Sequence, residues 1–493
     1  MGLRNHFKSL ILLGERMDRR EASRLSSMHH LRPSVLFGAS IVRTISMSSL
    51  LYNMKTVQPY RAAVTSFSAA APQHQQSGFE YDSGEYILST SSSSHDASAA
   101  SNTCVASALS NKSIVIYDSK SGQVIRRIEK AHDGPISQVS FFPCEYGPEG
   151  NANQNSNHPP LLISASQDGT VKVFDLRTNS SASAITTKMA LPNEQALCVS
   201  LGYGGTLAAV GTSKARVSFL DLRYSSGTNP TGALMGSYVD AHTEEVTQVK
   251  FQSVSNASGQ IKTVLATASE DGLLSIYDPS QPSEDVALLS TLNIGAPLRH
   301  IAFFGPNNEG ICALTGNETM SVWHWDSAQK VSDVGGIGLR GLLSDAVGKS
   351  GVNVDGGSSV EYLVGCTWAN ANCDQEAQQS PSNSKALHLL AGNSEGDGYL
   401  FRMDADQITP LRHLKGGHRG CIRDFCWIDN GIGGQRLVTG GEDARLCEWD
   451  LSGTSSAPSM PSSHNMGSGK VKQVKRDVAG KKKGNKKKFG SPY

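Results

Sequence analysis

Histidine, hydroxyl and carboxylate side chains recur at fixed spacing in this sequence, and together they could either perform catalysis or stabilise a fold. The fullest set is His418, Thr439, Asp443 and Trp449, where the Thr stands four positions before the Asp and the Trp six after it. The Asp can accept a hydrogen bond from the His, the His can meet the Thr hydroxyl, and the indole N–H can donate to that hydroxyl. Because every member of such a network is paired, we interpret the set as structural rather than catalytic.

Two further stretches carry a His, a hydroxyl residue and an Asp with the same offsets around the Asp. Their aromatic positions hold a Phe and a Tyr in place of Trp. The two sets are His132, Ser164, Asp168 and Phe174, and His242, Thr267, Asp271 and Tyr277. We predict the same buried network for both, with no catalytic residue, cofactor or metal ligand in the chain.

Short strands must position the fullest set. After Gly417 and His418, apolar-rich runs cover 421–427, 436–439 and 445–449, and the last run ends on Asp450. Runs of this length with period-two patterning, separated by polar turns, are typical of β-strands. A Gly-His start and a Trp-Asp end are typical of one blade of a β-propeller.

A single blade cannot bury its own faces, so the chain should contain several. Seven comparable endings occur, at Asp118, Asp175, Asp221, Asp278, Asp326, Asp404 and Asp450. We therefore predict an all-β fold that is one seven-bladed propeller. Blades three and five should lack the network, because Lys214 and Thr319 occupy the Asp position, whereas Asp397 restores the turn of blade six.

Ring closure requires a strand from the other end of the chain. After Asp450 the sequence has no fourth strand, and an open blade would expose a bare sheet edge. We predict that Ala62 to Phe67 supplies the outer strand of the last blade. Blade one then begins at 86–88, and the Ser-rich stretch from Ser89 to Asn102 is expected to form a mobile loop.

Other patterns argue against several classes of site. Gly336, Gly338 and Gly341 match GxGxxG, but in an all-β pattern we interpret them as a Gly-rich crossover between blades rather than a dinucleotide site. Nine cysteines without CxxC spacing argue against a disulfide framework or a zinc site, and favour a reducing compartment. We expect buried thiols at the nearest cluster, Cys421, Cys426 and Cys447. No run approaches the roughly 20 apolar residues that span a bilayer, so no membrane association is expected.

The net charge of +1 conceals a strong asymmetry along the chain. Residues 1–61 carry +7 and residues 470–493 carry +9, which leaves −15 for residues 62–469. We predict a basic, disordered extension or targeting segment at 1–54, the propeller at 55–452, and a disordered Lys-rich tail at 453–493. For the N-terminal arm, a transit peptide, a disordered extension and a start codon placed too far upstream all stay open.

Four segments of the sequence resemble the WD-repeat family: HTEEVTQVKF from His242, EDGLLSIYD from Glu270, GGHRGCIRDFCW from Gly416 and TGGEDARLCEWD from Thr439. The resemblance covers residues 56–451 and is strongest in blades four and seven. The long N-terminal arm and the Ser- and Asn-rich inserts depart from it. The resemblance implies a WD-repeat scaffold without an assigned activity.

The first functional hypothesis is a non-enzymatic scaffold for protein partners. Loop residues collect at one edge of the ring, where exposed polar and charged side chains are candidate contacts. The candidates are Gln167, Glu270 and Glu442, which each precede a network Asp, together with Glu244 and Arg419, which follow the repeat histidines. The ring itself is expected to be monomeric.

The second hypothesis is a ribosome-assembly or RNA-associated factor that uses its Lys-rich tail. Clustered lysines can pair with nucleic-acid phosphates or bind an import receptor, and few aromatic residues stand beside them for base stacking. The candidate import signal is Lys481, Lys482, Lys483, Lys486, Lys487 and Lys488. We therefore predict the nucleus, with the cytoplasm, or an organelle if the N-terminal arm is a transit peptide, as alternatives.

Overall fold

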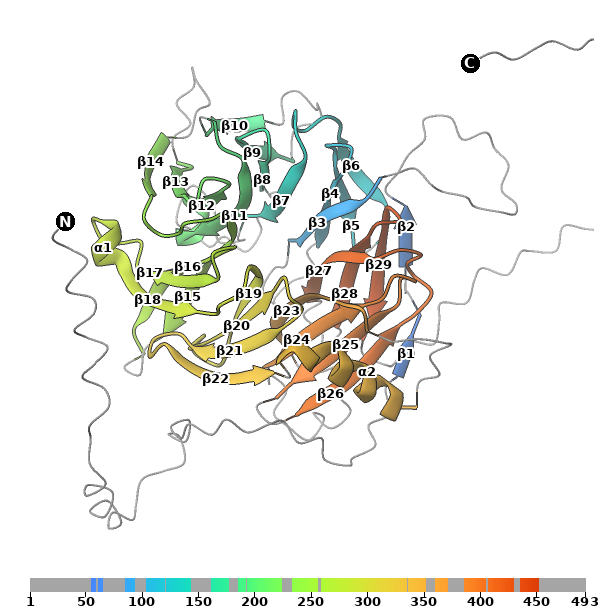
Figure 1. The fold of residues 1–493 in the computed structure, drawn as a ribbon. Coiled ribbons are helices and arrows are strands. Elements are labelled where there is room, and N and C mark those ends of the chain that lie inside the picture. Colours follow the sequence, from blue (N-terminus) through green and yellow to red (C-terminus); the bar gives the residue numbers. More distant parts are fainter. Residues whose placement is uncertain are drawn as a thin grey trace, which may run out of the picture. The chain divides into compact units, whose positions relative to one another are not determined.

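Seven β-sheets surround a common centre like the blades of a propeller (Figure 1). The computed structural model describes residues 55–58, 61–64, 85–93, 103–119, 121–142, 161–176, 185–191, 193–223, 233–255, 259–334, 336–351, 360–370, 385–404, 407–429 and 435–451. The predicted all-β, seven-bladed propeller is confirmed. Within these residues, no helix is long and apolar enough to cross a bilayer. The boundaries at 54 and 452 stay predictions, and the Lys-rich tail lies outside the described residues.

Blades one to four each contain four consecutive antiparallel strands. Short runs of β-branched and other apolar residues favour these strands, and polar turns end them. The strands are β3 (Ile87–Ser92), β4 (Cys104–Leu109), β5 (Ile114–Asp118) and β6 (Val124–Ile128) in blade one; β7 (Ile136–Phe141), β8 (Leu161–Ser166), β9 (Thr170–Asp175) and β10 (Ile185–Ala190) in blade two; β11 (Ala196–Gly202), β12 (Leu207–Thr212), β13 (Val217–Asp221) and β14 (Ala233–Tyr238) in blade three; and β15 (Val246–Ser255), β16 (Ile261–Ser269), β17 (Leu273–Tyr277) and β18 (Leu288–Asn293) in blade four.

Blades five to seven continue the pattern, and two short α-helices lie in connections. The strands are β19 (Leu298–Phe304), β20 (Gly310–Thr315), β21 (Met320–His324) and β22 (Gln329–Val334) in blade five; β23 (Tyr362–Asn370), β24 (Lys385–Gly392), β25 (Gly398–Met403) and β26 (Ile408–Leu414) in blade six; and β27 (Ile422–Asp429), β28 (Gln435–Gly441) and β29 (Arg445–Asp450) in blade seven. The helices are α1 (Glu284–Ala287) and α2 (Leu339–Lys349), with 3-10 turns at η1 (Tyr203–Gly205) and η2 (Gly336–Gly338).

The N-terminal segment adds one strand to each of two blades. Strand β2 (Arg61–Val64) pairs antiparallel with β29 and supplies the fourth strand of blade seven. The predicted closing strand is therefore confirmed, with a start one residue earlier, and residues 65–67 lie outside the described part. Just before it, β1 (Lys55–Val57) pairs in parallel with β26 as a fifth strand on blade six, which the sequence did not predict.

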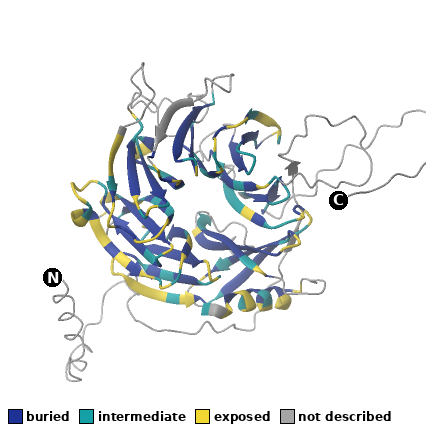
Figure 2. Cartoon of the chain, turned by 45° about the horizontal axis from the view of Figure 1, so that its top comes forward, coloured by how far each residue is buried: buried dark blue, intermediate teal, exposed yellow. Residues whose placement is uncertain are grey.

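The core is divided into clusters between neighbouring blades, because the sheets pack face to face. Between blades four and five, Leu274 and Ile276 pack with Ile301 and Ile311, and all four side chains are fully buried. Figure 2 shows the buried strands inside the blades, and the exposed residues on turns and outer strands. At roughly 25 cal/mol per Å² of apolar surface removed from water, this burial is the main stabilising contribution.

Side chains on the first strand of each blade connect it to the next blade. In each case one side chain hydrogen-bonds to a main-chain atom of the following first strand, and blade seven connects back to blade one. The pairs are Ser89 Oγ with Val139 N (3.3 Å), Gln138 Oε1 with Val199 N (2.8 Å), Ser200 Oγ with Phe251 N (3.0 Å), Gln248 Oε1 with Ile301 N (2.5 Å), His300 Nε2 with Cys366 O (2.8 Å), Tyr362 Oη with Ile422 N (2.6 Å) and Asp424 Oδ2 with Thr90 N (2.5 Å).

One expectation is wrong and one is confirmed. The Ser-rich stretch was expected to be a loop from Ser89, but β3 continues to Ser92, because its hydroxyls find main-chain partners in blades two and seven. Residues 94–102 lie outside the described part. The GxGxxG segment connects blade five to blade six, as predicted, and it contains η2 and continues into α2, whose Leu343 and Val347 are buried. Strands β22 and β23 on either side belong to different sheets, so the segment forms no βαβ unit.

Candidate functional site

The His418 imidazole in blade seven lies between a carboxylate and a hydroxyl. Its Nδ1 is 3.1 Å from Oδ1 of Asp443, and its Nε2 is 2.7 Å from Oγ1 of Thr439. The Trp449 indole N–H donates to the same Thr439 oxygen at 2.8 Å. Asp443 also accepts the Arg419 main-chain N–H at 2.8 Å. The four side chains therefore form a continuous network that connects the start of the repeat to the β28–β29 turn.

Blade two contains a shorter version of this network. His132 Nδ1 is 3.3 Å from Asp168 Oδ2, and His132 Nε2 is 2.6 Å from Ser164 Oγ. The hydroxyl of Thr170, which no pattern singled out, lies 2.9 Å from His132 Nδ1 and 2.6 Å from Asp168 Oδ1. Phe174 is fully buried but has no donor to offer, so its position contributes packing alone.

Blade four repeats the three-residue arrangement. His242 Nδ1 is 3.1 Å from Asp271 Oδ2, and its Nε2 is 2.8 Å from Thr267 Oγ1. The Tyr277 ring packs against Tyr238 of blade three, with the ring centroids 4.8 Å apart. The aromatic residue six positions after the Asp therefore donates a hydrogen bond to the hydroxyl in blade seven, whereas in blade four it packs against an aromatic ring of the neighbouring blade.

Burial and nearby groups set the ionisation of the three histidines. Burial is the main cause that lowers the pKa of His132 to about 4, against the opposing Asp168 carboxylate, and it also lowers the pKa of His242. At His418 burial acts in the same direction, but the Cys447 sulfur and the Asp443 carboxylate outweigh it and raise the pKa above its ordinary value. All three histidine side chains are 0% exposed, and a structural role for the networks stays a prediction.

The remaining turns use other solutions. In blade three, Thr212 Oγ1 accepts the Lys214 N–H at 3.3 Å. In blade five, the hydroxyls of Thr315 and Thr319 are 2.6 Å apart. In blade six, the Asp397 carboxylate lies 3.1 Å from His413 Nε2, and this His comes from the outer strand β26 rather than from the repeat start. By strand register, Asp397 and Thr319 each lie two residues after the position of Asp443, which Glu395 and Asn317 occupy, so the predicted positions of these two residues are wrong.

An equivalent main-chain hydrogen bond in blades two, four and seven places the candidate contact residues on one edge of the ring. The residue before each network Asp donates its N–H to a carbonyl at the start of its repeat. These bonds join Gln167 to Pro135 (2.9 Å), Glu270 to Glu245 (3.0 Å) and Glu442 to Cys421 (2.9 Å). The turns of blades two, four and seven therefore present their side chains from equivalent positions.

The candidate contact residues are accessible to solvent. Gln167, Glu244, Glu270 and Arg419 are exposed, and Glu442 is half-exposed with an ion pair to Arg423. They come from three separate blades, so they line one edge rather than gather in a cleft. The six tail lysines lie outside the described residues. Among the residues that the structure places, no group of three or more His, Cys, Asp or Glu could hold a metal ion.

The described cysteines are all free thiols, and five of the seven are buried. Cys447 is buried, as expected for the cluster in blade seven. Cys421 and Cys426 are partly exposed, so the expectation of buried thiols is wrong for these two. They lie on or beside β27, the first strand of the blade, and Cys426 packs at the edge of the buried cluster between blades seven and one.

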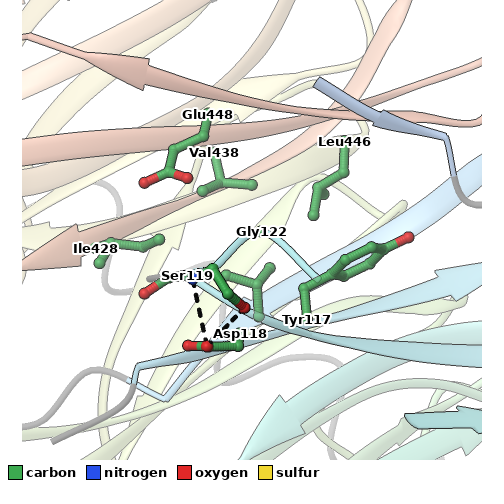
Figure 3. A pocket seen from close by; sticks show the side chains of 10 residues that line it. Tyr117, Asp118, Ser119, Gly122, Ile428, Val438, Leu446 and Glu448 are labelled. Carbon is green, nitrogen blue, oxygen red and sulfur yellow. Dashed lines mark hydrogen bonds between the residues drawn. The ribbon is translucent and has the colours of Figure 1, made fainter. Parts of the chain in front are cut away.

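A cavity of about 230 Å³ lies between blades one and seven (Figure 3). Its lining is mixed: Val105 of β4 and Ile428, Val438 and Leu446 of blade seven are apolar, whereas Asp118, Ser119, Ser121 and Glu448 are polar or charged. The Glu448 carboxylate is already bound by Arg436 at 2.6 Å. The volume is below the roughly 300 Å³ at which small-molecule sites begin, so the cavity fits a single side chain rather than a cofactor. Sequence reasoning missed the cavity because the residues that line it are far apart in the chain and meet only when blades one and seven close the ring.

Known proteins share both the repeat and the ring. A family model for "WD domain, G-beta repeat" matches residues 122–175, which hold most of blade two. The chain is 26% identical to the WD repeat-containing protein 89 homolog of Dictyostelium discoideum over 345 residues, 70% of this chain and 79% of that protein. The chain therefore contains a WD repeat and is similar to WD-repeat proteins over most of its length. This fold commonly serves as a scaffold for protein partners.

One further likeness is narrower, and another concerns structure. The chain is 29% identical to the ribosome biogenesis protein ytm1 of Botryotinia fuckeliana over 145 residues, 29% of this chain and 27% of that protein. A chain in the structure titled "Crystal Structure of Mitotic Checkpoint Complex" superposes with a TM-score of 0.50 and 14% identity, covering 86% of this chain and 99% of that chain. At that identity the likeness concerns the fold alone.

Proposed function

We propose that this WD-repeat propeller is a non-enzymatic scaffold in a nuclear complex and binds protein partners at the edge formed by its repeat turns. The equivalent anchoring of Gln167, Glu270 and Glu442 carries this proposal. Rigidly held turns present side chains with little loss of conformational entropy on binding. Glu244 and Arg419, which stand beside the buried histidines, extend the same edge.

Blade four offers the most concentrated charge on this edge. Glu244, Glu245 and Glu270 are all exposed. Ser269 Oγ donates to the Glu244 carbonyl at 3.1 Å, and Glu270 N donates to the Glu245 carbonyl at 3.0 Å, so the three backbones are held together. No described Lys or Arg forms an ion pair with these carboxylates. We therefore expect the partner to contribute a basic segment at blade four.

A charge reversal with a matched control tests this edge. Glu244→Lys with Glu270→Lys should remove the partners that co-purify with the tagged full-length chain. Asp285→Lys with Asp326→Lys makes the same change of charge beyond the other ends of β17 and β21, and should keep them. Equal recovery of every partner by both variants would show that binding occurs elsewhere.

A ribosome-assembly or RNA-associated role is the second candidate, favoured by the likeness to a ribosome biogenesis protein and by the six tail lysines. Affinity purification with mass spectrometry separates the two candidates. Recovery of pre-ribosomal proteins that disappears in a chain ending at Gly469 would support this second role. A ubiquitin-ligase or chromatin complex that survives the truncation would support the first.

The nuclear location rests on the lysine clusters, which are dense enough to bind an import receptor. Fluorescent fusions of the whole chain and of the chain ending at Gly469 test it. The whole chain should accumulate in the nucleus, and the shortened chain should not. Accumulation of both in an organelle with a processed N-terminus would replace the nuclear assignment with a transit peptide.

A further inference from the structure

Two cysteine sulfurs meet where blades five and six pack together. Cys312 lies on β20 of blade five and Cys366 on β23 of blade six, and their Sγ atoms are 3.3 Å apart. The two residues are 0% and 1% exposed, and both are free thiols. A disulfide needs about 2.05 Å between the sulfurs, so small side-chain rotations would bring the pair to bonding distance.

The surroundings of the two sulfurs are unequal. Burial disfavours the Cys366 thiolate, but the hydrogen bonds that Cys366 shares with the Cys312 sulfur and the His300 imidazole, with the charges of His300 and Lys250, outweigh burial and lower the pKa of Cys366. Burial and the neighbouring Cys366 raise the pKa of Cys312. His300 is fixed in place by its hydrogen bond to the Cys366 carbonyl at 2.8 Å. Cys366 is therefore the nucleophile of the pair, and Cys312 holds the proton.

We propose that Cys312 and Cys366 form a peroxide-responsive thiol pair that can join blades five and six covalently. The Cys366 thiolate attacks one oxygen of hydrogen peroxide, the O–O bond breaks, and the leaving hydroxide takes up a proton to become water. Cys366 is then a sulfenic acid. The Cys312 sulfur attacks the Cys366 sulfur, the S–O bond breaks, and a second water leaves as the disulfide forms. The two thiols lose two electrons, and the peroxide gains them.

The position of the pair gives the crosslink a structural consequence. Cys366 lies on the first strand of its blade, and Cys312 on the second strand of the preceding blade, so the bond would join two sheet faces across their interface. Blade five also lacks the buried His–Asp network. A covalent bond would therefore strengthen this junction, where the described contacts include packing and hydrogen bonds between side chains of blade five and the main chain of blade six.

Peptide mapping of the full-length chain tests the proposal. The reduced protein is treated with hydrogen peroxide, denatured, alkylated and digested. We expect a linked peptide that contains Cys312 and Cys366 and disappears on reduction, together with a rise in Tm of roughly 2–4 °C. In Cys312→Ser, the sulfenic acid on Cys366 should persist and react with dimedone. Cys366→Ser should give neither product.

A buried cysteine elsewhere provides the matched control. Cys198 is 2% exposed, and its Sγ donates to the Val246 carbonyl at 3.4 Å. Cys198→Ser should leave the yield of the 312–366 linkage unchanged. The proposal is overturned if peroxide oxidises the partly exposed Cys421 and Cys426 while Cys312 and Cys366 of the wild-type chain are both recovered fully alkylated. That measurement on the wild-type chain does not depend on how well any variant folds.

Discussion

Blades seven and five solve the same structural problem in different ways. In blade seven, buried side chains connect the repeat start to the turn, through His418, Asp443 and Thr439. In blade five, the Thr315 and Thr319 hydroxyls bond only within the turn. The Trp449 indole reaches the blade-seven network, whereas the indole of Trp323, at the equivalent register position of blade five, donates to the Ser321 hydroxyl at 2.9 Å.

The difference shows which part of the repeat is indispensable. Both blades keep the main-chain bond between the turn and the repeat start, from Glu442 to Cys421 in blade seven and from Gly316 to Pro297 in blade five. Both blades therefore have the main-chain hydrogen bond between the turn and the repeat start. The buried network is present in only one of them, and we expect it to add stability to a turn that forms without it. Blades with the network should resist unfolding more than blades without it.

Removal of the closing strand should have the largest effect, because it takes one strand from the blade with the complete network. A chain that begins at residue 69 lacks β2 and exposes the edge of β29, so we expect aggregation. A chain that begins at residue 59 lacks only β1 and should stay folded. Light scattering and thermal unfolding of both chains measure this. A soluble chain from residue 69 with an unchanged Tm would mean that another segment closes blade seven.

Asp443→Ala should destabilise the fold by about 2–4 kcal/mol, because His418 and the Arg419 N–H lose a buried acceptor. Thr319→Ala removes a turn hydroxyl of blade five that is one of a local pair with Thr315, and should cost about 1 kcal/mol or less. Urea unfolding of both variants gives the comparison. Equal losses would contradict the stabilising role assigned to the network.

The pH dependence distinguishes blade two from blade seven. Because burial lowers the pKa of His132 from 6.5 to about 4, the unfolded state takes up a proton first as the pH falls. The stabilising contribution is complete above pH 6.5 and is lost between 6.5 and about 4, on the order of 2–3 kcal/mol. His132→Gln should therefore reduce the loss of folding stability between pH 6.5 and about 4. The pKa of His418 is raised instead, so the stabilising contribution of this residue stays complete below pH 6.5. His418→Gln should therefore leave the loss of stability at acid pH unchanged. Identical pH profiles for the two variants would contradict this distinction.

Repetition explains how much the sequence could predict. The blade number and the network residues of blades two, four and seven follow from local spacing that recurs. The closing strand follows from a missing fourth strand. Strand β1 could not be predicted, because three residues carry no pattern and their pairing depends on the completed blade six. Serine composition suggested a loop at Ser89–Ser92, yet neighbouring blades supply the partners that make it a strand. The 312–366 contact likewise depends on two blades packing together.

Hydrogen exchange of the wild-type chain tests the central claim most directly, since it compares the blades within one molecule. The measured quantity is the exchange rate of amides in the β-turns, resolved by peptide mass spectrometry. The turns at Asp168, Asp271 and Asp443, which accept hydrogen bonds from buried histidines, should exchange more slowly than those at Lys214 and Thr319. The same protection at all five turns would show that the buried networks do not stabilise their blades.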